Sequence, residues 1–172
     1  MESRVLVAYA SKYGATKEIA EKIGQVLEEN GLRVDVLPAR QAGNPEPYGA
    51  VVLGSAAYIG QWRKEASRFV KNNAETLVKK PTWLFSSGPT GEGDAVEMMK
   101  GWRYPKGLGP FIDLIKPRDI TVFHGVLKTE KMNFLEKWVI KNVKSPTGDF
   151  RDWDAITRWA VNIAGELKKV GG

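Results

Sequence analysis

The sequence predicts a doubly wound α/β domain, in which helices cover both faces of a parallel five-stranded sheet. Five short apolar segments alternate with longer stretches in which apolar residues recur at helical spacing. Parallel strands need crossover connections, and right-handed helical crossovers place helices on both faces of the sheet. The 172 residues show no internal repeat and no linker, so we expect residues 1–172 to form a single domain.

The first half of the chain supplies three of the expected strands. Residues 5–9 are a nearly continuous apolar run, typical of a strand buried on both faces, and residues 33–37 and 50–54 form the next two strands. Prolines and glycines at residues 38–47 predict a loop. A helix ending at Asn30-Gly31 follows the first strand. A helix follows the third strand, with these residues facing inward: Trp62, Ala66, Phe69, Val70, Ala74 and Leu77.

The second half of the chain supplies the last two strands and most of the helices. Residues 82–86 and 120–123 are the fourth and fifth strands. A polar, glycine-rich loop at residues 88–93 follows the fourth strand. The expected helical segments are residues 95–102, 111–115, 133–143 and 153–170.

Composition excludes several kinds of site. The sequence has no cysteine, which excludes disulfides, thiolate metal sites and cysteine nucleophiles, and its single histidine, His124, cannot form a metal site alone. No segment approaches the roughly 18 apolar residues of a membrane span, so we expect a cytoplasmic protein. The net charge of +6 suits an acidic partner, an anionic membrane surface, nucleic acid or merely good solubility. The basic residues are spread over several helices, so we expect no nucleic acid binding.

The loop after the first strand has the composition of a phosphate-binding site. Ser11 and Thr16 offer hydroxyls, Gly14 permits close approach of the backbone, and the helix start offers free N–H groups. A plain helix cap would explain Thr16 alone, but it explains the combination after a buried strand less well. Neither the P-loop pattern nor the dinucleotide glycine pattern is present, so these two classes of phosphate loop are excluded.

The loop after the third strand also has features of a ligand site. It offers small residues for close backbone approach, Gly60 for an unusual dihedral angle, and Tyr58 as an aromatic neighbour for a ring. A loop tyrosine with no ligand is the alternative for Tyr58. The spacing of Trp62 with Ala66 makes core packing at least as good an explanation as ligand contact for this tryptophan.

These motifs resemble those of flavodoxins. Ser11, Gly14 and Thr16 after the first strand resemble the FMN phosphate loop, while residues 54–62 and 123–127, with 148–153, resemble proteins grouped with menaquinone-dependent protoporphyrinogen oxidase. The resemblance implies a flavodoxin-like three-layer sandwich with strand order 2-1-3-4-5 and FMN as cofactor. The implied cofactor-binding residues are Ser11, Lys12, Tyr13, Gly14, Ala15, Thr16, Ala56, Ala57, Tyr58, Ile59, Gly60, Ser87, Gly88, Pro89, Thr90 and Gly91.

The resemblance also implies a function, an FMN-dependent oxidoreductase that dehydrogenates a porphyrinogen and passes electrons to quinone. The alternatives are a flavodoxin-type electron carrier between redox proteins and a flavin-free binding domain of the same fold. A flavin carries the redox chemistry itself, so no catalytic side chain is required. His124 ends the fifth strand and could contact substrate or shuttle a proton, a structural role being the alternative. The oligomeric state is left open, a homo-oligomer included.

The expected helix at residues 133–143 is both amphipathic and basic. Packing on the domain with solvated lysines is the more common arrangement for such a helix. The alternative is contact with a membrane surface, where a quinone would reside. One face carries Phe134, Leu135, Trp138 and Val139, and the same segment carries Lys131, Lys137, Lys141 and Lys144.

Overall fold

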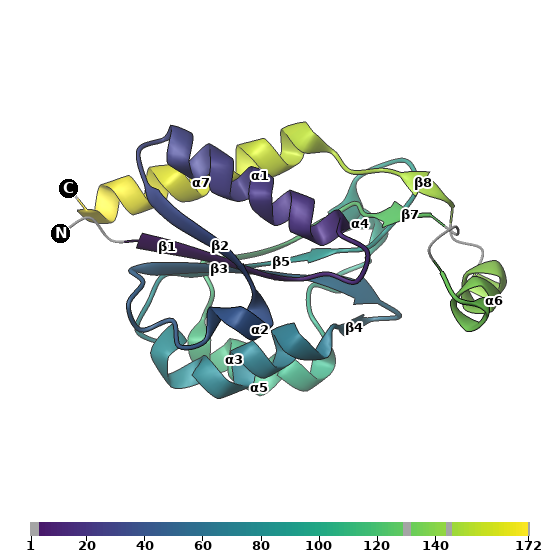
Figure 1. Cartoon of the computed structure of the whole chain (residues 1–172), viewed down its shortest axis with the longest axis horizontal. Helices are drawn as coiled ribbons and strands as arrows, with labels where there is room; N and C mark the ends of the chain where they lie inside the picture. The colour runs from purple at the N-terminus through teal and green to yellow at the C-terminus, as the bar shows by residue number, and fades with distance from the viewer. Residues whose placement is uncertain (1–3, 129–131, 144–145, 172) are drawn as a thin grey trace.

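A parallel sheet of five long strands lies between two layers of helices (Figure 1). The computed structural model describes residues 4–128, 132–143 and 146–171. The strand order is β2-β1-β3-β5-β6, which confirms the expected order 2-1-3-4-5 when the long strands are numbered along the chain. A two-residue strand, β4 (Gln61–Trp62), pairs antiparallel with the end of β3. The long strands are β1 (Arg4–Ala10), β2 (Arg33–Pro38), β3 (Ala50–Tyr58), β5 (Thr82–Ser87) and β6 (Asp119–Phe123).

The helices cover the two faces of the sheet as the doubly wound fold requires. One face carries α1 (Ala15–Glu29) and α7 (Trp153–Gly171), and Figure 1 shows these two helices side by side above the sheet. The opposite face carries α2 (Ala39–Ala42), α3 (Lys64–Leu77), the 3-10 helix η1 (Lys106–Leu108) and α5 (Gly109–Ile115).

A third group of elements lies at the end of the sheet where the strands finish. It comprises α4 (Ala95–Met98), a hairpin of β7 (Val126–Leu127) with β8 (Gly148–Asp149), and α6 (Phe134–Val143). The chain leaves the sandwich through β7, forms α6 and returns through β8. Figure 1 shows α6 beyond the end of the sandwich.

The core has two layers because successive strand residues point to opposite faces of the sheet. Val5, Val7 and Tyr9 of β1 pack in the layer under α1 and α7, whereas the alternate residues of β1 pack in the layer under α3 and α5. Both layers are apolar, which explains why the strands are nearly continuous apolar runs. Three rings, Phe85, Phe123 and Trp159, fill the first layer with centroids 5.5 to 5.9 Å apart.

Several boundaries differ from the prediction. Trp62 lies in β4, before α3, although its side chain is buried as expected. The predicted helix at 95–102 ends at Met98 because Lys100 and Gly101 take positive φ values of 48° and 91°. A four-residue helix, α2, occupies part of the predicted loop at 38–47. Each helix within the described ranges is too short or too polar to span a bilayer.

Candidate functional site

The candidate site lies where the parallel strands end. Ligands of open α/β sheets bind outside the carboxyl ends of the strands. The segments that follow β1, β3, β5 and β6 all lie at this edge, and each of the three loops singled out in the sequence is among them (Figure 1). The architecture therefore places the predicted site residues at one edge of the sheet.

The first loop forms an anion-binding cradle at the start of α1. Gly14 takes a left-handed φ of 93°, and its N–H donates to the Ser11 hydroxyl oxygen at 3.0 Å. The first helical hydrogen bond runs from Glu18 N to Gly14 O, so the N–H groups of the preceding turn have no acceptor in the helix. The space beside Gly14 is open, since a Cβ there would meet no atom within 4 Å.

This geometry fits a phosphate group. Unpaired N–H groups at a helix start and the helix dipole both favour an anion, and the Ser11 hydroxyl keeps its own proton available for donation. Thr16 is buried in the first turn of α1, two residues after Gly14. Ser11, Gly14, Ala15 and Thr16 therefore lie together at a helix start, where an anion is favoured.

The other two residues of this loop reach in a different direction. The Lys12 ammonium and the Tyr13 hydroxyl both donate to the carboxylate of Glu136 on α6, more than 120 positions along the chain. These hydrogen bonds hold the pKa of Glu136 below its usual value and raise the pKa of Lys12. The contact is formed by ionised Glu136, so it is lost as the pH falls through the lowered pKa of that carboxylate.

The second loop is a tight hairpin between β3 and β4. Tyr58 pairs with Gln61, and the two turn residues, Ile59 and Gly60, have φ values of 49° and 69°. Glycine adopts such angles freely, but a β-branched residue does so at a cost of about 1 to 3 kcal/mol. Ala56 and Ala57 are half-buried at the end of β3, while the Tyr58 and Ile59 side chains are exposed at the tip. The unusual dihedral expected at Gly60 is present, and the one at Ile59 was not anticipated.

The third loop packs by direct backbone contact against its neighbours. Gly88 N donates to Phe123 O at 3.2 Å, and Gly125 N donates to Pro89 O at 3.0 Å. A Cβ added at Gly88 would lie 2.9 Å from Ala57 O, and one at Gly125 would lie 3.2 Å from the Gly88 backbone. The ends of β3, β5 and β6 therefore meet at distances that only glycine allows. Ser87 and Thr90 of this loop are buried and Gly91 has a positive φ.

His124 is part of the same loop packing. Its ring is 7% exposed, with Nδ1 3.0 Å from Pro89 O and Nε2 2.6 Å from Gly93 O. Both ring nitrogens are thus directed at the backbone of the third loop. Among the described residues, no group of three or more His, Asp or Glu side chains could hold a metal ion.

Two residues that the sequence analysis did not single out hold the site together. The first is Glu136, and the second is Arg151. The Arg151 side chain is only 9% exposed, and it donates to Asp149 at 2.7 and 3.0 Å and to Ala15 O at 3.3 Å. Its hydrogen bonds lower the pKa of Asp149. Arg151 thereby ties β8 to the first turn of α1. The sequence signal that could have identified Arg151 was the segment 148–153. The contact of Glu136 with Lys12 and Tyr13 joins residues so far apart in sequence that it leaves no local pattern.

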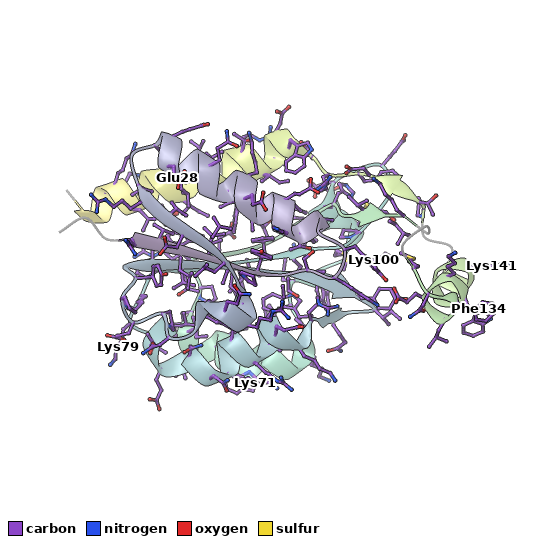
Figure 2. The ribbon with its side chains drawn as sticks, viewed as in Figure 1. Glu28, Lys71, Lys79, Lys100, Phe134 and Lys141 are labelled. Carbon is purple, nitrogen blue, oxygen red and sulfur yellow. The ribbon has the colours of Figure 1, made fainter. Side chains whose placement is uncertain are left out.

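The expectation that α6 packs its apolar residues on the domain is wrong for the described side chains. Phe134, Leu135 and Trp138 are 85, 68 and 57% exposed, and Lys137 and Lys141 are also exposed. Figure 2 shows Phe134 pointing away from the body of the domain. The reason is that the β7–β8 hairpin carries α6 beyond the end of the sandwich. The side chain of Val139, together with Lys131 and Lys144, lies outside the described residues.

Comparison with known proteins gives consistent matches over most of the chain. A family model described as a flavodoxin domain matches residues 6–154. A protoporphyrinogen IX dehydrogenase [quinone] of Escherichia coli K12 is 22% identical over 94% of each chain. A flavodoxin from the domain Archaea superposes with a TM-score of 0.62 at 17% identity, covering 96% of this chain and 99% of the other. The rubredoxin oxygen:oxidoreductase of Desulfovibrio gigas superposes with a TM-score of 0.65 at 14% identity, covering 96% and 36%.

Proposed function

Because this chain belongs to the flavodoxin domain family, we propose that it is an FMN-dependent oxidoreductase that dehydrogenates a porphyrinogen and passes the electrons to a quinone. FMN is the cofactor, and the observation that carries its placement is the open cradle between Ser11 and Thr16. The substrate and acceptor are supported by the E. coli relative, whose similarity extends over 94% of both chains.

Different parts of the site would hold the phosphate and the ring of FMN. When bound, FMN supplies the exchange of two electrons between substrate and quinone. Ser11, Thr16 and the N–H groups at the start of α1 would hold the phosphate. The hairpin tip with Tyr58 and the loop 87–91 would border the ring from two sides. Each step would remove two hydrogen atoms from the porphyrinogen and add two to the quinone, which becomes the quinol.

A direct assay tests this proposal. Purified protein loaded with FMN is mixed under anaerobic conditions with protoporphyrinogen and a water-soluble menaquinone analogue, and porphyrin formation is followed by its fluorescence. We expect porphyrin to form only when the quinone analogue is present. A protein that retains FMN and yet forms no porphyrin above the enzyme-free rate would overturn the enzymatic proposal.

An electron carrier is the second candidate, and the likeness to solved flavodoxins favours it. A carrier with a net charge of +6 would need an acidic partner face. A redox titration separates the candidates. Two well-separated one-electron potentials indicate a carrier, and a single two-electron step indicates the dehydrogenase.

We further propose that α6 contacts the membrane that holds the quinone. Exposed Phe134 and Leu135 lie on a short helix with exposed Lys137 and Lys141, a combination suited to an anionic bilayer surface. Burying a large apolar side chain contributes about 1.5 to 3 kcal/mol. Each of these residues could therefore account for about tenfold in vesicle affinity.

The double variant Phe134→Ser/Leu135→Ser should bind vesicles at least tenfold more weakly than the unmodified protein. The measurement is co-sedimentation with vesicles that contain an anionic phospholipid, at low and physiological salt. Val161→Ser is the matched control, because Val161 is an exposed apolar residue on α7, the helix that packs beside α1 on the sheet. Equal vesicle binding by the double variant and the control would contradict the membrane contact.

A further inference from the structure

His124 makes two contacts that one neutral imidazole cannot satisfy together. Its two ring nitrogens lie 3.0 Å from Pro89 O and 2.6 Å from Gly93 O, and a carbonyl oxygen can only accept a hydrogen bond. Neutral imidazole has a single N–H, so one ring nitrogen would place its lone pair against a carbonyl oxygen. Only the doubly protonated imidazolium donates to both carbonyls.

The two carbonyls belong to opposite ends of the loop that follows β5. The Pro89 end has other support, because Gly125 N donates to the same carbonyl and Gly88 N donates to Phe123 O. The Gly93 end is held by the 2.6 Å contact with His124 Nε2. The ring therefore spans the loop from residue 89 to residue 93, and it fixes both ends to the end of β6.

The surroundings of the ring provide a place for a positive charge. His124 lines a cavity of about 260 Å³ that also borders on Asp94, Asp152 and Arg158. Asp94 accepts from Glu97 N and Asp152 accepts from Ala155 N, so both carboxylates are fixed as helix caps. Two carboxylates and one guanidinium leave this cavity with a net negative charge before the imidazolium is counted.

We propose that His124 is a proton-dependent positioning residue for the FMN site. In the imidazolium form it closes residues 89–93 against the end of β6, and loss of one proton removes one of its two hydrogen bonds to the loop. This role rests on the proposed function in one respect, namely that the loop borders the flavin ring.

The sign of the pH dependence follows from which state of the loop binds the proton. The closed loop holds two protons on the ring, so a rise in pH that removes one of them opens the loop. We expect FMN affinity to fall about tenfold when the ring loses this proton, the factor that corresponds to one hydrogen bond. The effect is fully present at the acid end and lost at the alkaline end.

The first test needs no cofactor. Because the chain has one histidine, a long-range proton–nitrogen NMR spectrum of the labelled, FMN-free protein shows one imidazole ring. We expect both ring nitrogens to be protonated at pH 5.5, and amide exchange at residues 90–93, corrected for intrinsic rates, to accelerate as the ring loses a proton. A ring with one proton at pH 5.5, or exchange that does not follow its titration, would overturn the proposal.

The second test measures the affinity for FMN from pH 5.5 to 8 by quenching of its fluorescence. His124→Gln and His124→Asn keep one amide donor on the side chain and do not titrate in this range. The FMN phosphate also titrates near pH 6, so the decisive quantity is the difference between each variant and the unmodified protein. We expect the tenfold fall in the unmodified protein and a smaller one in both variants, and an equal fall in all three would overturn the role of His124. A chain that binds no FMN would refute the proposed function, while the cofactor-free test would still decide the role of the ring.

Discussion

Replacement of Thr16 by alanine is expected to weaken FMN binding by about ten- to a hundredfold and to leave riboflavin binding nearly unchanged. Thr16 is buried in the first turn of α1 beside the cradle, and its hydroxyl would donate to a charged phosphate oxygen. A hydrogen bond to a charged group contributes about 1.5 to 3 kcal/mol, which corresponds to this range of affinities. Riboflavin has no phosphate, so it cannot lose this bond.

Gly14→Val should have the same selectivity with a larger effect. Valine at φ 93° is strained and fills the open space in which the phosphate would sit. Both variants are compared by titrating the FMN-free protein with FMN and then with riboflavin, at one pH and ionic strength. If affinity for the two flavins fell by the same factor, these residues would shape the loop and would not bind phosphate.

Replacement of Gly54 by alanine is expected to destabilise the domain by about 3 kcal/mol or more. Gly54 lies in the centre of the sheet, and an added Cβ would overlap the Cζ and Cε atoms of the Phe85 ring. That ring is fully buried between Phe123 and Trp159, so it has no free direction in which to move. Urea denaturation followed by tryptophan fluorescence measures the change.

Two further variants isolate the cause of this loss. Gly165→Ala on α7 adds a Cβ that meets no atom within 4 Å, and should stabilise the domain by about 0.5 to 1 kcal/mol. The pair Gly54→Ala with Phe85→Leu removes the overlapping ring atoms. This pair should therefore lose less stability than the two single changes predict together. Additive losses would show that overlap with Phe85 is not the source.

The fold could be predicted because its main strands and helices are long enough for their patterns of apolar residues to be recognised. The residues 5–9 and 50–54 are apolar throughout, and in the structure they form the centre of β1 and the first five residues of β3. The elements that were not predicted, α2, β4, η1 and the two strands of the β7–β8 hairpin, have two to four residues each. A segment of that length shows no periodicity, so its structure is decided by contacts with the rest of the fold.

The candidate site could be predicted in part for a similar reason. The Ser11 to Thr16 loop could be recognised because a strand, a loop and a helix start succeed one another there, and these are local features of the sequence. The contact of Glu136 with Lys12 joins residues 124 positions apart, and the exposure of Phe134 depends on where β7 and β8 carry α6. An amphipathic pattern indicates only that a helix has an apolar side, and does not say what covers that side.

The carboxylate of Glu136 joins α6 to the loop that forms the phosphate cradle. Lys12 and Tyr13 lie in the chain between Ser11 and Gly14 of the cradle, and their side chains donate to Glu136. If docking of α6 to a surface changes the affinity for FMN by some factor, then bound FMN changes the affinity of α6 for that surface by the same factor. Binding of FMN and docking of α6 to a surface would in this way influence each other through Glu136.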